Sequence, residues 1–240
     1  MSRTDFDVES LARHLRMDAG QVARMAERGK LPGRRIAGQW RFSQAEIHMW
    51  WEDRISNGSN EELASFESVL HGATEVAVEP LSSIAEILPL DAIAIPLTAR
   101  TRTSVITSVV ELAVGTGLLW DGDKMEEAVR ARESVHSTAL DNGVALLHPP
   151  RPIASILAQP LLALGRTSQG IPFGHHRGTL TDIFFLICST DDSTHLWVLA
   201  RLSRLIGDAC VLNQLREAPD AESARQLLID AEAELALPLA

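Results

Sequence analysis

Hydrophobic residues near the start of the chain recur at the spacing of short helices. A first helix is predicted where apolar residues lie three or four positions apart, at Val8, Leu11, Ala12 and Leu15. A second helix is expected from Asp18 to Arg28, because Asp18 is a favourable N-cap and Gln21 is its capping-box partner. Gly29 is placed to end this helix.

After the second helix the pattern changes to alternation. The segment GKLPGRRIAGQWRFS predicts a tight hairpin around Gly38, with Arg35 and Arg41 pointing into solvent and three inward side chains, Ile36, Trp40 and Phe42. Ser43 and Glu46 form a second capping box, which predicts a third helix through Ile47 and Trp50.

A polar joint over residues 56–80 separates this module from the rest of the chain. Its first five residues, SNGSN, predict a flexible break. Leu63, Phe66 and Leu70 then lie at helical spacing, and Gly72 is placed to end that short helix.

The segment 81–240 mixes helical periodicity with short apolar runs. Buried strands are expected at 144–147, 161–164 and 183–188. Helices are expected through Val105 and Leu112, over 123–134, over 192–206, and through Leu215 and Leu227. Strands interleaved with helices indicate an α/β layered domain, so we expect two domains, residues 1–55 mainly α-helical and residues 81–240 of the α/β class.

Charge divides the chain in the same way. Residues 1–55 hold ten Lys or Arg and eight Asp or Glu, a balance of +2, so the remaining residues carry −12 and the whole chain −10. This asymmetry suggests modules with different partners. No stretch has the length and apolarity of a membrane span, and the N-terminus lacks a secretory signal. With only two cysteines, both expected to be reduced, we expect a cytoplasmic protein.

The order helix, turn, helix, Arg-rich hairpin, helix is that of a winged helix-turn-helix. Residues 5–53 resemble the excisionase/MerR-type DNA-binding family, which has a helix-ending Gly, Leu-Pro, two basic residues, and a Gly turn before Trp-Arg-Phe-Ser. The matching residues are Gly29, Leu31, Pro32, Arg34, Arg35, Gly38, Trp40, Arg41, Phe42 and Ser43. The resemblance implies that the helix from Asp18 to Arg28 enters the major groove while the hairpin follows the backbone.

Residue types on these elements suit nucleic acid. Gln21, Arg24 and Arg28 lie along one side of the second helix, where Gln and Arg read base edges. Arg34, Arg35 and Arg41 suit phosphates, which position a protein without specifying sequence. Because +2 is a modest charge, we expect weak binding by one copy and a dimer or tandem site. The alternatives are that these arginines only solvate a small domain, or that the module binds protein.

The stretch from Arg132 to Pro152, RESVHSTALDNGVALLHPPRP, carries a second resemblance. It is similar to the fructose/mannitol and nitrogen-regulatory class of phosphotransferase-system IIA domains (EIIA type 2), in which Arg-Glu is followed by Ser-Thr and then Gly-x-Ala-x-Pro-His. The residues in register are Arg132, Glu133, Ser137, Thr138, Gly143, Ala145 and His148. The family's second histidine corresponds to His195, in His-Leu-x-x-Leu-Ala, and the likeness spans about residues 81–236. It implies a mixed sheet flanked by helices.

The resemblance implies that His148 accepts a phosphoryl group from a phosphohistidine carrier protein of the HPr type. A neutral imidazole is a competent nucleophile near pH 7, and Arg132 would pair with phosphoryl oxygens. His195 would contact the phosphoryl group or hold the ring of His148, and Thr138 would add a hydroxyl donor. The other interpretation of each histidine is a structural one, a partly buried His148 and a core His195.

The chain departs from the family pattern at the histidine itself. Leu147 stands where the family has Pro, and Pro149-Pro150 follow, which alters the strand exit. No cofactor or metal is expected: His175-His176 have only Asp182 nearby as an acid, so a surface loop is the better interpretation. We expect a phosphoryl carrier that couples phosphotransferase state to DNA binding, and not a turnover enzyme. The alternative is an EIIA-like domain without phosphotransfer that binds protein or ligand.

Overall fold

The computed structural model describes residues 5–15, 17–57, 63–64, 67, 81, 83–174 and 178–235. The chain forms two compact units, residues 1–78 and 79–240. The proposed helix through Leu63, Phe66 and Leu70 falls largely outside the described residues, as do His175 and His176. Within the described ranges, no helix is both long enough and apolar enough to cross a membrane.

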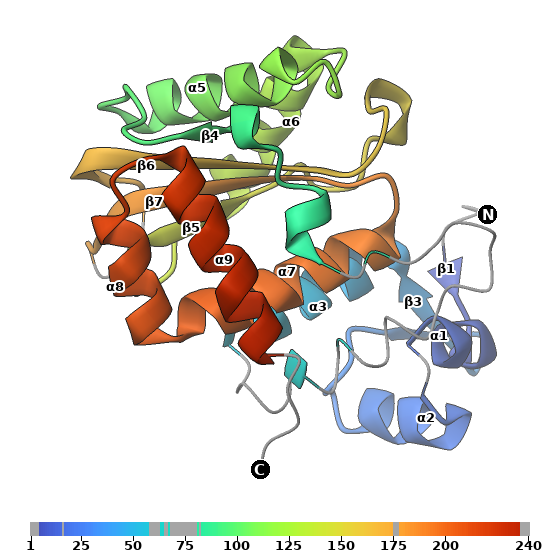
Figure 1. The fold of residues 1–240 in the computed structure, drawn as a ribbon. Helices are drawn as coiled ribbons and strands as arrows, with labels where there is room; N and C mark the ends of the chain where they lie inside the picture. Colours follow the sequence, from blue (N-terminus) through green and yellow to red (C-terminus); the bar gives the residue numbers. More distant parts are fainter. Residues whose placement is uncertain are drawn as a thin grey trace. The chain divides into compact units, whose positions relative to one another are not determined.

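The N-terminal unit is a small helical domain with a three-stranded sheet. Its elements are β1 (Asp5–Phe6), α1 (Val8–Leu15), α2 (Ala19–Glu27), β2 (Arg34–Ile36), β3 (Gln39–Ser43) and α3 (Gln44–Asn57) (Figure 1). The predicted caps of α2 are confirmed, since the Asp18 carboxylate accepts from the Gln21 amide at 3.1 Å and Gly29 has φ +66°. The strand β1, which pairs antiparallel with β3, was not predicted from the sequence.

The hairpin forms as predicted, but the assignment of its faces was wrong. Ala37 and Gly38 both have positive φ, so the turn has two residues and pairs Ile36 with Gln39. Partners in an antiparallel ladder share a face, which places Arg35 with Trp40, and leaves Ile36 on the opposite face, 53% exposed. Phe42 is fully buried as expected. The prediction placed Ile36 and Trp40 on the same face. With a two-residue turn Ile36 is opposite Gln39, so it shares a face with Gln39 and not with Trp40.

The C-terminal unit is built on a four-stranded mixed sheet in the order β4-β6-β7-β5. The strands are β4 (Ile93–Ala94), β5 (Val144–Leu147), β6 (Leu161–Pro172) and β7 (Leu180–Cys188). β5 runs parallel to β7, and β6 runs antiparallel to β7 and parallel to β4. β6 and β7 are longer than predicted because their outer halves pair beyond a β-bulge between Arg166 and Ile171, where apolar content is low.

Helices cover both faces of this sheet (Figure 1). On one side lie α5 (Arg102–Gly115) and α6 (Gly122–Val135), and on the other lie α7 (Asp192–Gly207), α8 (Ala209–Glu217) and α9 (Ala221–Leu235). The fold class and these five predicted helices are confirmed. The side chains between α5, α6 and the sheet form one core that includes Val109, Val129 and Phe184, all fully buried. This packing holds the end of β5 against the helix pair.

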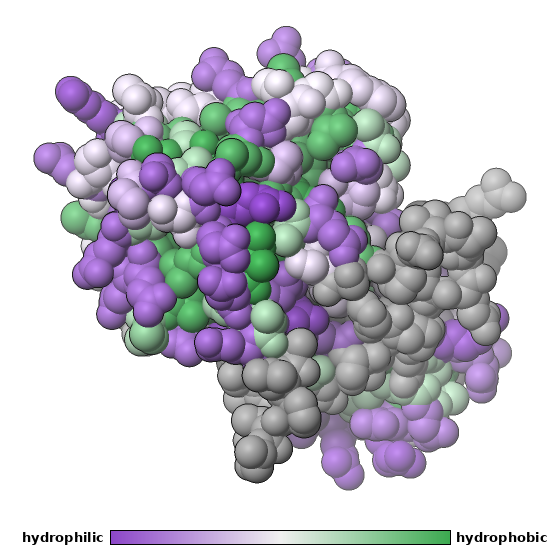
Figure 2. Space-filling model, viewed as in Figure 1, coloured by the Kyte–Doolittle hydropathy of each residue, from purple (hydrophilic) through white to green (hydrophobic). Residues whose placement is uncertain are grey.

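Figure 2 shows hydrophilic residues over most of the visible described surface, with smaller hydrophobic areas between them. Trp120 and Val135 are exceptions, at 65% and 73% exposed. Single exposed apolar residues are common on folded proteins.

Candidate functional site

The described structure places the predicted nucleic-acid residues on two neighbouring segments of the N-terminal unit. Gln21, Arg24 and Arg28 are exposed along α2, and Arg34 and Arg35 are exposed on the hairpin. Arg41 is half-buried on β3. Arg35 and Arg41 lie on opposite faces of the hairpin, because Arg35 shares a face with Trp40 and Arg41 shares one with Arg34. The predicted phosphate contacts are therefore divided between two surfaces.

Each hairpin arginine has an acidic neighbour. Arg34 donates to Glu46 at 2.8 Å, Arg35 lies 3.5 Å from Glu27, and Arg41 lies 3.7 Å from Asp7. Arg35 also stacks over the Trp40 ring, with its guanidinium carbon 5.1 Å from the ring centroid. Exposed ion pairs of this kind contribute about 0–1 kcal/mol each, so an arginine can exchange its carboxylate for a phosphate at small cost.

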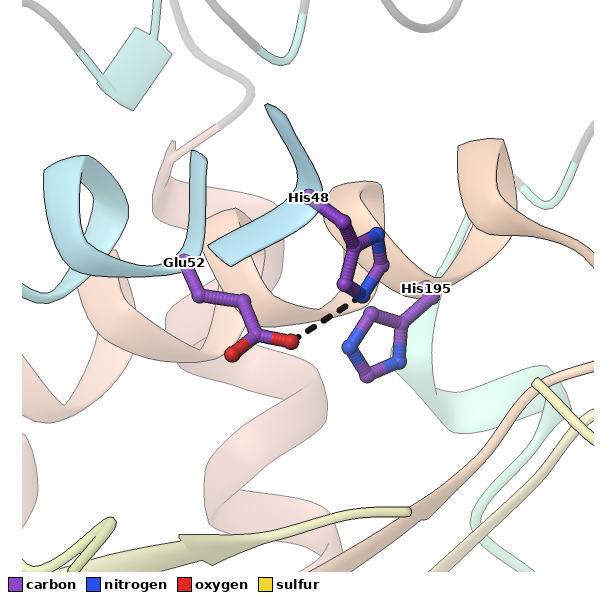
Figure 3. A group of neighbouring side chains, drawn as sticks. All are labelled: His48, Glu52 and His195. Carbon is purple, nitrogen blue, oxygen red and sulfur yellow. Dashed lines mark ion pairs between the residues drawn. The ribbon is translucent and has the colours of Figure 1, made fainter. Parts of the chain in front are cut away.

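Asp7 is held in its charged form by local contacts. The Ser10 hydroxyl and amide donate to its carboxylate and lower its pKa below the usual range, and Arg41 adds a smaller electrostatic effect. On α3, His48 Nε2 lies 3.0 Å from the Glu52 carboxylate one turn later, and this pair links two turns of that helix (Figure 3).

In the C-terminal unit His148 follows directly on the last residue of β5. Leu147 is fully buried and paired with Leu186 of β7, so the strand continues regularly to the histidine. His148 is 2% exposed as a residue, and its Nδ1 lies 2.8 Å from the Leu146 carbonyl oxygen. A carbonyl oxygen only accepts, so the proton of the neutral ring is on Nδ1 and the lone pair is on Nε2. The backbone thus selects the tautomer whose nucleophilic atom is Nε2.

His195 lies beside His148. It is in the first turn of α7, which begins after Asp191, whose carboxylate accepts from the Thr194 amide at 2.9 Å. The two imidazole rings meet edge to face, with centroids 5.0 Å apart, and His195 is 1% exposed. The structure therefore brings together two predicted residues that are 47 positions apart in the sequence.

The other two predicted residues belong to the segment that leads into β5. Arg132, near the end of α6, donates to the carbonyl of His136 at 2.8 Å. Thr138 is buried, and both its amide, at 3.0 Å, and its hydroxyl donate to the Glu133 carboxylate. The hydroxyl that was expected to donate a hydrogen bond to the phosphoryl group is therefore already bonded to Glu133.

Sequence reasoning assigned no role to Glu133 or to Arg102. The Glu133 side chain is 1% exposed and forms an ion pair of 2.9 Å with Arg102 at the start of α5. Glu133 was visible as the second residue of the Arg-Glu pair, and its burial was indicated by its helical phase with Met125 and Val129. Arg102 lies 31 residues earlier, and its local pattern does not indicate the contact with Glu133, so only the folded chain identifies it.

With this geometry established, comparison with known proteins defines the class. Residues 86–231 match the family model of the phosphoenolpyruvate-dependent sugar phosphotransferase system, EIIA 2, and residues 6–55 match that of a helix-turn-helix domain. The chain belongs to the EIIA 2 family, with a helix-turn-helix domain preceding the EIIA domain.

Similar proteins agree with this class. The fructose-specific EIIABC component of Bacillus subtilis is 30% identical over 142 residues, which is 58% of this chain and 22% of that protein. A nitrogen regulatory protein of Pseudomonas aeruginosa is 28% identical over 115 residues, 47% of this chain and 73% of that protein. Among solved structures, nitrogen regulatory protein IIA-Ntr from Neisseria meningitidis has a TM-score of 0.54 at 24% identity, covering 60% of this chain and 98% of that one. The last likeness supports the fold.

Proposed function

We propose that this protein is a regulator of the phosphotransferase system, of the nitrogen-regulatory type, in which His148 accepts a phosphoryl group and the helix-turn-helix domain binds DNA. The observation that carries the proposal is the hydrogen bond from Nδ1 of His148 to the Leu146 carbonyl, with His195 edge-on beside the ring. Together they provide a nucleophilic Nε2 and a second imidazole next to it. The donor would be a phosphohistidine carrier of the HPr type.

The transfer step balances without any further reactant. The lone pair of His148 Nε2 attacks phosphorus, the new N–P bond forms, and the N–P bond to the carrier's imidazole breaks, so that the carrier leaves with its electron pair. His148 retains its proton on Nδ1, and the Leu146 carbonyl stabilises the positive charge that builds on the ring. Phosphoryl transfer needs positioning and charge neutralisation more than covalent assistance.

The predicted neighbours have distinct roles in this proposal. His195 would donate to a phosphoryl oxygen or hold the His148 ring, and Arg132 would pair with the oxygens by turning from the His136 carbonyl. A hydroxyl contact from Thr138 stays a prediction, and it would require release of the hydroxyl from Glu133.

The DNA-binding half of the proposal rests on the exposed side of α2 and on the hairpin. Gln21, Arg24 and Arg28 would contact bases, while Arg34, Arg35 and Arg41 would contact phosphates. The low positive charge of residues 1–55 favours binding as a homodimer or at tandem sites. Phosphorylation adds about 1.5–2 negative charges to a segment that is already acidic, which would change its affinity for DNA-bound or protein partners.

The proposal is tested by phosphorylation of the full chain. The protein is mixed with a phosphorylated HPr-type carrier, and its intact mass is recorded under alkaline conditions that preserve phosphohistidine. We expect one added phosphoryl group, lost in His148→Ala and retained in His136→Ala, a control at an exposed histidine near the same site. DNA affinity is then measured with and without the phosphoryl group. No transfer from several competent carriers to folded protein would overturn the proposal.

A second candidate function is a binding module that has lost phosphotransfer. Leu147 before His148 and Pro149 after it favour this alternative, because they alter the strand exit that the family pattern has at its acceptor histidine. In that case the mass experiment gives no adduct. DNA binding by the N-terminal unit would be unchanged between the wild type and His148→Ala.

A further inference from the structure

We infer that Glu133 is a positioning residue for His148: it clamps the Ser137–Leu140 segment against β5 and thereby orients the Leu146 carbonyl that selects the His148 tautomer. This inference deepens the proposed function and rests on it for its consequence in phosphoryl transfer. The effect of Glu133 on the His148 tautomer can be tested whether or not His148 is phosphorylated.

The clamp begins with a buried carboxylate that has partners on both sides. On one side Arg102 donates to Glu133 Oε2 at 2.9 Å and also to the Glu133 carbonyl. On the other side Glu133 Oε1 accepts from the Thr138 amide at 3.0 Å and from the Thr138 hydroxyl. A buried carboxylate is tolerated only when it is paired and hydrogen-bonded, and these contacts meet that requirement. Glu133 therefore joins the N-terminus of α5 to the segment before β5.

Arg102 is itself fixed by a second contact. Its guanidinium carbon lies 5.4 Å from the centroid of the Phe173 ring, and Phe173, the residue after β6, is fully buried. Ser137 bridges the same groups, since its hydroxyl lies 3.3 Å from Glu133 Oε2 and 3.2 Å from the Phe173 carbonyl. The contacts with Arg102 and with the Phe173 carbonyl through Ser137 thus fix the position of the Glu133 carboxylate. The carboxylate in turn orients the segment around Thr138.

That segment runs alongside β5 as a short extra pairing. The Leu140 amide donates to the Val144 carbonyl at 2.8 Å, Ala139 bridges to Ala145, and the Leu146 amide donates to the Thr138 carbonyl at 3.4 Å. The N–H of Leu146 is therefore bound to Thr138, and the carbonyl of the same residue, in the next peptide unit, accepts from His148 Nδ1 at 2.8 Å.

These contacts form one path from Glu133 through Thr138 and Leu146 to His148. When an amide replaces the carboxylate, one of the two acceptor oxygens becomes an NH2 group, so either Arg102 or Thr138 loses its acceptor and the segment is held less firmly against β5. β5 remains paired with β7 through Leu147, but the Leu146 carbonyl is then placed less precisely against Nδ1. The His148 ring would exchange between its tautomers, and the Nε2 lone pair would be present for only part of the time.

The test uses Glu133→Gln in the full chain, with Glu126→Gln as the matched control. Glu126 lies two turns earlier on α6, also pairs with an arginine, Arg130, and is more exposed. The first measurement is the ¹⁵N chemical shift of both His148 ring nitrogens. We expect the wild type and Glu126→Gln to show a single tautomer protonated on Nδ1, and Glu133→Gln to show averaged shifts. A single unchanged tautomer in folded Glu133→Gln would overturn the inference.

The second measurement is the rate of phosphorylation by the carrier. In Glu133→Gln the maximal rate should fall roughly tenfold to a hundredfold, as expected for a slightly misplaced nucleophile, with half-saturation by carrier unchanged. A purely structural role would lower the stability and leave the tautomer unchanged. If even the wild type is not phosphorylated, the proposed function fails, while the tautomer measurement still decides the role of Glu133.

Thr138→Val gives a graded check because it retains the backbone amide. It removes the hydroxyl contact with Glu133 but leaves the amide contact and the carbonyl that pairs with Leu146. We expect a tautomer population between those of the wild type and Glu133→Gln. An effect larger than that of Glu133→Gln would contradict the proposed path and indicate a direct role for the hydroxyl.

Discussion

The two candidate sites of this chain would interact with phosphate groups in different ways. On the N-terminal unit, hairpin arginines lie at the surface and pair with carboxylates at 2.8–3.7 Å. In the C-terminal unit His148 and His195 are buried, and a backbone carbonyl sets the tautomer of His148. An exposed cation contributes through charge that solvent and salt weaken, whereas a buried nucleophile depends on position. Substitutions around His148 should therefore reduce phosphorylation strongly, whereas substitutions of the hairpin arginines should each weaken DNA binding slightly and additively.

The largest effect is expected for His195→Ala. If His195 donates to the phosphoryl group or holds the His148 ring, its loss should reduce the single-turnover rate of phosphorylation roughly a hundredfold, the usual cost of one preorganised donor. Rapid-quench sampling of the intact mass measures this rate. His136→Ala should remain close to the wild-type rate. A wild-type rate in His195→Ala would make His195 a core residue, as one interpretation of the sequence holds.

Gly143→Ala should destabilise the fold before β5. Gly143 has φ +84°, and an added Cβ would lie 2.8 Å from Arg216 Nη2 and 3.1 Å from the Leu180 carbonyl. A strained residue of this kind costs on the order of 1–3 kcal/mol, visible as a lower urea midpoint. The control is Gly115→Ala at the end of α5, where nothing lies within 4 Å of the added Cβ and φ is not positive. Equal midpoints for the two variants would contradict this account.

Arg35→Ala and Arg41→Ala should weaken DNA binding only several-fold each. Each variant removes about one phosphate contact, so the slope of log affinity against log salt should decrease in magnitude by about 1. Fluorescence anisotropy at several salt concentrations gives both quantities. Arg54→Ala on α3 changes the charge equally and serves as the control. Equal losses in all three variants would indicate a general charge effect without a defined surface.

The smallest expected effect is a difference in alkylation between the two cysteine thiols. Burial raises the pKa of Cys188 to about 12, whereas Cys210 is exposed on α8. At pH 8 the Cys188 thiol is therefore almost entirely protonated and shielded, and iodoacetamide should add once to native protein and twice in urea. Mass spectrometry counts the adducts and a peptide digest locates them. Two rapid additions to the native chain would show that β7 is less protected than its packing indicates.

The sequence by itself determined the elements and the residue types of both sites. Helical spacing identified α1 and α5, and the capping residue Asp18 identified the start of α2, because these signals are local. The order of Arg132, Ser137-Thr138, Gly143 and His148 indicated the EIIA class, which the comparison confirms. Local patterns suffice where neighbouring residues decide the conformation.

Only the tertiary structure decided which groups meet. It paired His148 with His195, set the phase of the hairpin so that Arg35 faces Trp40, and directed the Thr138 hydroxyl to Glu133. Arg102 and Glu133 are 31 residues apart, and no local pattern indicates their contact. Such pairings follow from sheet register, turn parity and the packing of helices on the sheet, which depend on segments far apart in the chain.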